Sequence, residues 1–163
     1  MTFDTRLTES TNILAVLPTE RLSLQHNNLT GELPANLGVL NDAIHISLDN
    51  NDLTGTISTV LGHLDDIKYL SLNNNKFRGT IPTEIGTCFR LKTLLLGNNQ
   101  FSGEIPSELG QLDQIDTIAL SHNNFNGVSM PAQICDLVVS EDLTHLSADC
   151  NEKVTCDCCH KCT

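Results

Sequence analysis

The residues in this sequence that offer the most chemistry are cysteines, because six of the seven lie between positions 135 and 162. Such a cluster can form disulfides, which staple a short irregular segment in an oxidising compartment. A zinc site could instead use Cys159 and Cys162 with Cys156 and His160, but a second, well-separated pair with standard spacing is missing. The neighbouring Cys158 and Cys159 should each pair elsewhere, and the connectivity stays open. We predict disulfides among Cys135, Cys150, Cys156, Cys158, Cys159 and Cys162.

The other residue types give no catalytic or cofactor-binding pattern. The sequence holds no G-x-S-x-G, no H-E-x-x-H and no Gly-rich phosphate loop, and its aspartates lack calcium-loop spacing. Acidic residues number 20 against 9 basic ones, and the net charge of −11 repels nucleic acid and anionic lipid surfaces. No segment approaches the roughly 20 apolar residues of a membrane span. We expect a protein that is not an enzyme and has no cofactor, metal site, nucleic-acid partner or membrane span within this chain.

The elements that must position these residues follow from a repeat of 24 residues. Leucine, asparagine and glycine recur in fixed columns, and a fixed period of this length indicates a solenoid. The leucine and glycine columns are Leu24, Leu48, Leu72, Leu96 and Leu120, and Gly31, Gly55, Gly79, Gly103 and Gly127.

One unit can be interpreted physically at residues 67–82. Residues 67–72 alternate apolar and polar side chains, which predicts a short strand with one buried face. Asn75 should then point inward, where its carboxamide can satisfy N–H and C=O groups of its own coil and the next. Gly79 permits a turn with positive φ. We predict a structural ladder of Asn27, Asn51, Asn75, Asn99 and Asn123.

These columns, written LxxLxLxxNxFxGxIPxxIGxC, closely resemble the plant-type leucine-rich repeat over residues 17–137. The resemblance implies an α/β fold, a right-handed solenoid with a parallel β-sheet on the concave face. It also implies turns and short 3-10 or α segments, single turns at most, on the convex face. Ser58 in place of Pro, Ala43 in place of Leu or Ile, and one extra residue before Pro131 should bend or loosen single coils.

The two ends of the chain differ from the repeats. Residues 1–18 form a flank without the paired cysteines that usually open plant-type repeats, and they contain no secretory signal, so we expect a fragment or a truncated gene model. Residues 19–137 hold five repeats, and 138–163 hold a capping coil, with Asn151 in the ladder position, and a Cys-rich cap. The strings ICDL, LTHLSADC and CxCCxxC resemble the C-terminal cap of leucine-rich-repeat proteins predicted from diatom genomes.

Two single residues carry further predictions. Cys88 falls in the column of Leu40, Leu64 and Leu112, so we expect a buried free thiol that replaces leucine. Asn28 begins the one N-x-[ST] glycosylation sequon and should face outward. The histidines are expected on the solvated surface, in columns whose members lie many coils apart: His45 with His145, and His26 with His122.

The outward strand positions form the surface that can vary without harm to the core. Tyr69 and Leu95, with Lys68 and Lys92, predict a small amphipathic patch in an otherwise acidic protein, and His45 lies in the column of Tyr69. Apolar anchors inside a polar rim are typical of interfaces. A neighbouring column is small and flat: Ser23, Ser47, Ser71, Leu95, Ala119 and Ser147.

We predict non-catalytic recognition of a protein, peptide or glycan through the concave face. The resemblance to plant-type receptors implies an extracellular or cell-surface ectodomain. Three alternatives stay open, since function lies in surface residues. The chain could inhibit a secreted hydrolase, like the polygalacturonase inhibitors that share this repeat. It could bind ice or a mineral surface through its flat Ser, Thr and Asn columns, or act as an intracellular scaffold with a zinc-bound tail.

Overall fold

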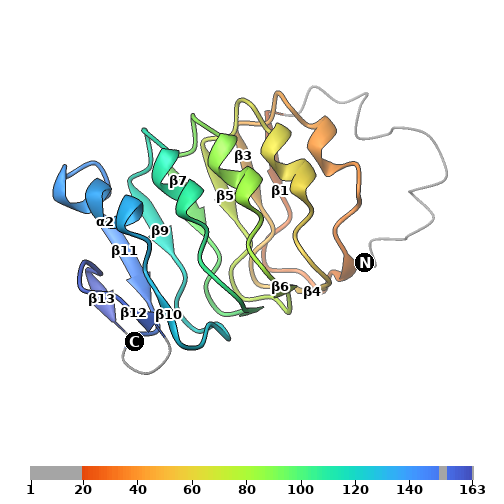
Figure 1. Ribbon diagram of the computed structural model, residues 1–163. Coiled ribbons are helices and arrows are strands. Elements are labelled where there is room, and N and C mark those ends of the chain that lie inside the picture. The colour runs from red at the N-terminus through yellow and green to blue at the C-terminus, as the bar shows by residue number, and fades with distance from the viewer. Residues whose placement is uncertain (1–19, 151–153, 163) are drawn as a thin grey trace.

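The computed structural model describes residues 20–150 and 154–162, which form a solenoid of stacked coils (Figure 1). A seven-stranded parallel sheet runs along one side, and its strands follow one another in chain order. Coils one to five carry the first five strands of this sheet, and we call the described residues from 132 onward the cap. The strands are β1 (Arg21–Ser23), β3 (His45–Ser47), β5 (Tyr69–Ser71), β7 (Thr93–Leu95), β9 (Thr117–Ala119), β11 (His145–Ala148) and β13 (Lys161–Cys162).

Shorter elements complete each coil. Three two-stranded parallel sheets follow the turns after the long sheet, and helical segments stack on one another along another side (Figure 1). This architecture confirms the predicted leucine-rich-repeat solenoid. The small sheets pair β2 (Thr30–Glu32) with β4 (Asp52–Thr54), β6 (Arg78–Gly79) with β8 (Gln100–Phe101), and β10 (Val128–Ser129) with β12 (Val154–Thr155). The 3-10 helices are η2 (Leu37–Val39), η3 (Thr59–His63), η4 (Thr83–Thr87) and η5 (Ser107–Gln111), and the α-helix is α2 (Ala132–Val139).

The repeat length sets the register of the long sheet, because residues 24 positions apart face each other on neighbouring strands. His45 pairs with Tyr69, and Tyr69 pairs with Thr93. At the cap the step lengthens to 28, since Thr117 pairs with His145. A column in the sequence is therefore a row of touching side chains in space.

The core is a stack of apolar layers, one from each coil. Ile46, Leu70 and Leu94 point inward from successive strands and are at most 2% exposed. The rings of Phe77 and Phe101 stack with their centroids 6.3 Å apart. Each fully buried side chain of this kind contributes about 1.5–3 kcal/mol relative to its exposed form, so the layers stabilise the stacking of every coil on its neighbours.

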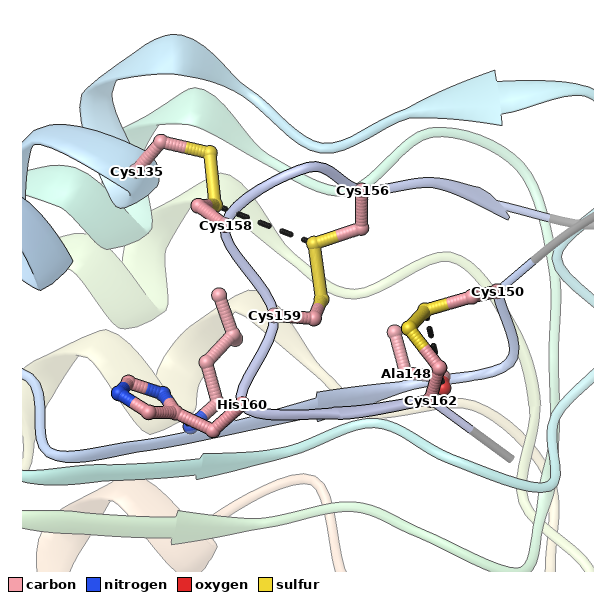
Figure 2. The surroundings of a disulfide bond; sticks show 9 residues. Cys135, Ala148, Cys150, Cys156, Cys158, Cys159, His160 and Cys162 are labelled. Atoms are coloured by element: carbon pink, nitrogen blue, oxygen red, sulfur yellow. Dashed lines mark hydrogen bonds between the residues drawn. A yellow bond between two sulfur atoms is a disulfide. The ribbon is translucent and has the colours of Figure 1, made fainter.

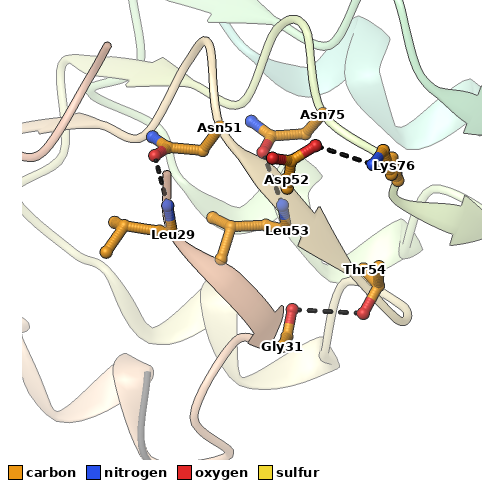
Figure 3. A network of polar contacts seen from close by, with 8 residues as sticks. All are labelled: Leu29, Gly31, Asn51, Asp52, Leu53, Thr54, Asn75 and Lys76. Carbon is orange, nitrogen blue, oxygen red and sulfur yellow. Dashed lines mark hydrogen bonds and ion pairs between the residues drawn. The ribbon is translucent and has the colours of Figure 1, made fainter. Parts of the chain in front are cut away.

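The Asn column satisfies the turn backbone from inside the solenoid (Figure 3). Asn75 Oδ1 accepts the N–H of Leu53 at 3.0 Å, and Asn75 Nδ2 donates to the carbonyls of Leu48 at 3.0 Å and Leu72 at 3.2 Å. Each carboxamide thus ties its own coil to the preceding one. The same pattern recurs at Asn51, Asn99 and Asn123.

The two ends of the ladder differ from its middle. Asn27 is exposed and donates to two carbonyls of its own coil. At the other end, the carboxylate of Asp149 accepts the N–H groups of His122 at 2.6 Å and Asn123 at 2.8 Å. In earlier coils the corresponding N–H groups donate to backbone carbonyls of the next coil. Asn151, predicted for the ladder, lies outside the described residues.

The residues of a second polar column turn the backbone after each strand of the long sheet. Asn50, Asn74 and Asn98 have φ values of 57°, 53° and 53°, in the left-handed region that asparagine tolerates better than most residues. His26 and His122 occupy the same column with φ values of 55° and 61°. The middle of the three consecutive asparagines at 73–75 therefore turns the chain, while the third belongs to the ladder. Sequence analysis placed His26 and His122 in one column but did not identify the asparagines of that column or its positive φ.

Two local expectations were wrong, and one strand was not predicted. Ser58 does not loosen its coil, because its φ and ψ of −77° and 146° are close to the −67° and 137° of Pro82, and its Oγ accepts the N–H of Val60. Helix α2 has eight residues rather than a single turn. The longer step into β11 supplies four extra residues, about one helical turn. Strand β13, which no repeat pattern predicts, adds the seventh strand beside β11.

We predict that Asn99→Ala lowers the free energy of unfolding by about 3–5 kcal/mol, because each buried group left without a partner costs about 1–3 kcal/mol. The groups affected are the N–H of Phe77 and the carbonyls of Leu72 and Leu96. Urea unfolding followed by circular dichroism measures the change. Exposed Asn124→Ala is the control and should stay within about 0.5 kcal/mol of the parent. Equal effects of the two substitutions would contradict the structural role of the ladder.

Candidate functional site

The residues predicted to form a binding surface come together on the long sheet. His45 begins β3, Tyr69 begins β5, and Leu95 ends β7, on three strands that are neighbours in the sheet. Lys68 and Lys92 lie immediately before β5 and β7, and the N–H of Lys92 donates to the carbonyl of Lys68 at 2.9 Å. We call these five residues the sheet-face patch.

An aromatic stack forms the middle of the patch. The rings of His45 and Tyr69 lie nearly parallel, with centroids 4.3 Å apart and an interplanar angle of 7°. The contact follows from the register, because directly opposed side chains of neighbouring strands lie about 4.5–5.5 Å apart. Both side chains are half-buried. The sequence placed the two residues in one column, but only the structure shows that their rings touch.

The surroundings of the stack favour a neutral imidazole. Burial lowers the pKa of His45 below its ordinary value of 6.5, the positive charge of Arg21 lowers it further, and the carboxylate of Asp49 partly opposes both. At neutral pH the neutral ring can stack on Tyr69 without bringing a charge into a partly dehydrated position.

Asp49 accepts hydrogen bonds from serines of the column beside the His45–Tyr69 stack. Ser47 Oγ donates to Asp49 Oδ1 at 2.6 Å, and Asn50 Nδ2 donates to Asp49 Oδ2 at 3.1 Å. Burial alone would raise the pKa of Asp49, but hydrogen bonds from Ser47, Ser71 and Asn50 outweigh it and hold that pKa below 3.8. The carboxylate therefore stays charged in the folded protein.

The expected flat serine column is not a continuous surface. Ser47 and Ser71 are 5% and 1% exposed, although both belong to the outward column. Hydrogen bonding to Asp49 occupies their hydroxyls. The prediction that these two serines lie on an accessible flat surface was wrong, and they cannot offer hydroxyls to a ligand.

The two lysines bring exposed positive charge to this face. Lys76 forms an ion pair with Asp52 at 2.6 Å, whereas neither Lys68 nor Lys92 forms an ion pair with any carboxylate in the described part of the chain. Leu95 lies half-buried on the neighbouring strand. The patch therefore combines an aromatic stack, an apolar side chain and two unpaired ammonium groups.

A separate groove lies beside the helical segments of coils three to five. It has a volume of about 760 Å³ and is lined by hydroxyl, carboxylate and apolar groups, among them Thr80, Glu104, Ile105 and Pro131. A Cβ atom at Gly127, whose φ is 66°, would have no neighbour within 4 Å. Sequence analysis did not identify the groove, although the extra residue before Pro131 marks its location.

The described residues offer no metal centre. In residues 20–150 and 154–162, no group of three or more His, Cys, Asp or Glu side chains is arranged to hold a metal ion. Nor does any helix in these ranges have the length and apolar character needed to cross a membrane. The exposed His145 lies with its Nδ1 2.9 Å from the hydroxyl of its neighbour Thr144.

All six cysteines of the cap are paired in the structure (Figure 2). Cys158 and Cys159 bond to different partners and not to each other. With these sulfurs in disulfides, a zinc-bound tail has no thiolate ligands. The bridges are Cys135–Cys158, which joins helix α2 to the tail, Cys150–Cys162, which joins the ends of β11 and β13, and Cys156–Cys159.

Cys88 is the seventh cysteine, and it is free and buried. Its side chain is 1% exposed, and its Sγ donates to the carbonyl of Leu61 at 3.4 Å. Burial, with a smaller effect of the carboxylate of Asp65, raises the pKa of this thiol to about 11. Asn28 is exposed at the turn before β2, and its glycosylation stays a prediction.

Comparison with known proteins places this arrangement in a family. The family model "Leucine Rich Repeat" matches residues 19–40, 66–88 and 90–112. A chain of the BIR3–SERK2 complex from Arabidopsis thaliana is 32% identical with a TM-score of 0.66, and the match covers 84% of this chain and 72% of that one. No curated protein sequence matches this chain. The protein belongs to the leucine-rich-repeat family, and the structures similar to it include plant receptor ectodomains and, at 24% identity, a plant ice-binding protein.

Two longer receptors are also similar. One structure is the Arabidopsis receptor kinase HAESA in complex with the peptide hormone IDA and the co-receptor SERK1; the match has 32% identity and a TM-score of 0.72, and covers 83% of this chain and 22% of that one. The other is the ectodomain of GASSHO1/SCHENGEN3 from Arabidopsis thaliana in complex with CASPARIAN STRIP INTEGRITY FACTOR 2, with 30% identity, a TM-score of 0.75, and coverage of 83% and 16%. This chain thus spans at most about a fifth of these receptor chains. None of the matches described here indicates an enzyme family.

We predict that His45 titrates below 6.5, that Arg21→Gln raises its pKa and that Asp49→Asn lowers it further, because the two charges act in opposite directions. The folded pKa lies below the unfolded one, so the unfolded state binds more protons, and stability falls as the pH drops below 6.5. NMR titration of the imidazole protons measures the three values. A pKa above 6.5, or one insensitive to Arg21→Gln, would contradict this environment.

Cys88 should resist alkylation in the folded protein at about pH 8, because a thiol reacts as its thiolate and burial suppresses that form. Iodoacetamide labelling read by mass spectrometry should show one labelled cysteine only after unfolding in denaturant without reductant. Labelling of Cys88 at the same rate in native and unfolded protein would show that the thiol is accessible.

Proposed function

We propose that this chain is a non-catalytic recognition module whose sheet-face patch binds an extended peptide or a protein segment. The observation that carries the proposal is the patch itself. Tyr69 stacks on His45, Leu95 lies on the next strand opposite Ser71, and neither Lys68 nor Lys92 forms an ion pair within the described residues. Interface hot spots are enriched in aromatic residues surrounded by polar groups. The patch lies on a rigid sheet, so its side chains are positioned before a ligand arrives, which reduces the entropy cost of binding.

The patch also indicates the chemistry of its ligand. Two ammonium groups that precede neighbouring strands favour a carboxylate, and the Leu95 side chain and the ring edges favour an apolar side chain in the same ligand. Because the whole chain carries a net charge of −11, a strongly acidic ligand would be repelled at longer range. We therefore propose a near-neutral segment with one acidic group beside an apolar residue.

The cellular context of the proposal is extracellular. Three disulfides within the cap suit an oxidising compartment. Structures similar to this chain include receptor ectodomains solved with a peptide hormone. A secreted or cell-surface location is therefore the setting that we propose.

A selection for peptide binders tests this proposal. The purified chain would be screened against a displayed random peptide library, and each enriched peptide would be titrated by the fluorescence of Tyr69, the single tyrosine in a chain without tryptophan. We expect Lys68→Ala and Lys92→Ala each to weaken binding, and the double variant to weaken it by about 30-fold or more, the scale of a hot spot of 2 kcal/mol.

Two controls make the result specific. Arg78→Ala removes an exposed positive charge from β6, outside the patch, and should leave the affinity within about twofold of the parent. Replacement of Tyr69 and Lys92 together by alanine should abolish binding, here followed by calorimetry, and leave the circular dichroism spectrum unchanged. Undiminished binding by that double variant would sink the proposal, as would a selection that enriches no peptide.

A further inference from the structure

Two of the three disulfides in the cap lie against each other (Figure 2). The Sγ of Cys156, bonded to Cys159, is 3.9 Å from the Sγ of Cys158, which is bonded to Cys135. All three cysteines of the tail loop, Cys156, Cys158 and Cys159, are only half-buried. A thiolate released at either of the two facing sulfurs would therefore already lie next to a disulfide sulfur of the other bridge.

Disulfides exchange when a thiolate attacks a disulfide sulfur, so the distance between sulfurs decides which exchanges are fast. We propose that the cap is a thiol–disulfide exchange site, in which an external dithiol opens one bridge and the facing sulfur then opens the other. The site would take small dithiols or the dithiol of a redox protein as its substrate. This inference does not depend on the sheet-face patch or its ligand.

The reaction can begin with attack of the dithiol on Cys159. A thiolate of the dithiol bonds to Cys159 Sγ, and the electron pair of the Cys156–Cys159 bond leaves on Cys156. The Cys156 thiolate bonds to Cys158 Sγ, and the electron pair of the Cys135–Cys158 bond leaves on Cys135, which takes up a proton. The second thiol of the dithiol, as its thiolate, then displaces Cys159, which also becomes a thiol.

The net reaction transfers two electrons and two protons from the dithiol, which becomes a cyclic disulfide. The protein keeps one new bridge, Cys156–Cys158, and gains thiols at Cys135 and Cys159. Entry at Cys135 leads to the same product, because it releases Cys158, which attacks Cys156 and displaces Cys159. The product therefore reports the contact between the two facing sulfurs, whichever of these entries is used.

The new bridge is geometrically accessible. Cys156 and Cys158 are separated by one residue, and two steps of about 3.8 Å between neighbouring Cα atoms cover the roughly 4.4–6.8 Å that a disulfide requires. The reacting sulfurs are already in contact at 3.9 Å. The exchange therefore needs local rearrangement of one loop and not unfolding of the solenoid.

The exchange would change how the cap is held. Cys135 lies on helix α2, so loss of the Cys135–Cys158 bridge disconnects this helix from the tail. The tail would stay on the sheet through the β11–β13 pairing and the Cys150–Cys162 bridge. The result is a cap whose helical side is released by a reductant while its sheet side stays fastened.

Limited reduction of the native full chain tests the proposal. The protein would be treated with less than one equivalent of dithiothreitol, quenched with acid, labelled with N-ethylmaleimide at low pH, and mapped by tandem mass spectrometry without further reduction. We expect a species with labels at Cys135 and Cys159 and a Cys156–Cys158 bridge. Labels at Cys156 and Cys159, or at Cys135 and Cys158, without any Cys156–Cys158 bridge would overturn the proposal.

Two variants guard against misassignment. Cys135→Ser with Cys158→Ser removes the second bridge, so reduction should label Cys156 and Cys159 and form no new bridge. Cys156→Ser with Cys159→Ser should give labels at Cys135 and Cys158 in the same way. If the Cys156–Cys158 bridge appears in the parent only after denaturant is added, exchange belongs to the unfolded chain, and the proposal fails.

Discussion

The buried turn at the end of each strand is the constraint on which the rest of this structure depends. Its N–H and C=O groups lie away from water, so they need partners that the turning backbone cannot supply alone. One asparagine in each coil supplies these partners. Its side-chain oxygen accepts an N–H of the preceding coil, and its NH₂ group donates to two carbonyls. Because each carboxamide bonds to its own coil and to the preceding one, these hydrogen bonds hold neighbouring coils at one spacing. The 24-residue period places one such asparagine in each coil.

This constraint also separates what must stay from what can vary. Packing restricts the residue types of the inward columns, and backbone conformation restricts those of the turn positions with positive φ. Neither restricts the residue types of the outward positions. The register nevertheless decides which outward side chains meet. His45 and Tyr69 can stack because a period of 24 residues places them opposite each other on neighbouring strands. The candidate site therefore consists of outward residues that differ from coil to coil, and the inward residues that recur in every coil set their relative positions.

The sequence allowed prediction of the fold, its columns and the buried position of Cys88, because each feature recurs in several copies that support one another. Prediction failed where no copies exist. The second turn of helix α2 and the edge strand β13 belong to the aperiodic end of the chain. The burial of Ser47 and Ser71 also escaped prediction, since a column shows which way a side chain points but not what covers it. The disulfide pairing could not be predicted either, because the spacing of cysteines in the sequence does not determine which sulfurs are close in space.

The cap satisfies the backbone N–H groups of the last coil in a different way. In the last coil, the carboxylate of Asp149 accepts two N–H groups whose counterparts in earlier coils donate to backbone carbonyls of the next coil. Three disulfides, with sequence separations of 23, 12 and 3 residues, close loops in the chain between Cys135 and Cys162. Disulfides of this kind typically contribute about 2–4 kcal/mol, more for longer loops. The repeats rely on hydrogen bonds and buried leucine, which a reductant does not touch, and the single thiol among them is buried. Sensitivity to redox conditions is therefore confined to one end of the molecule, away from coils two to four, where the sheet-face patch lies.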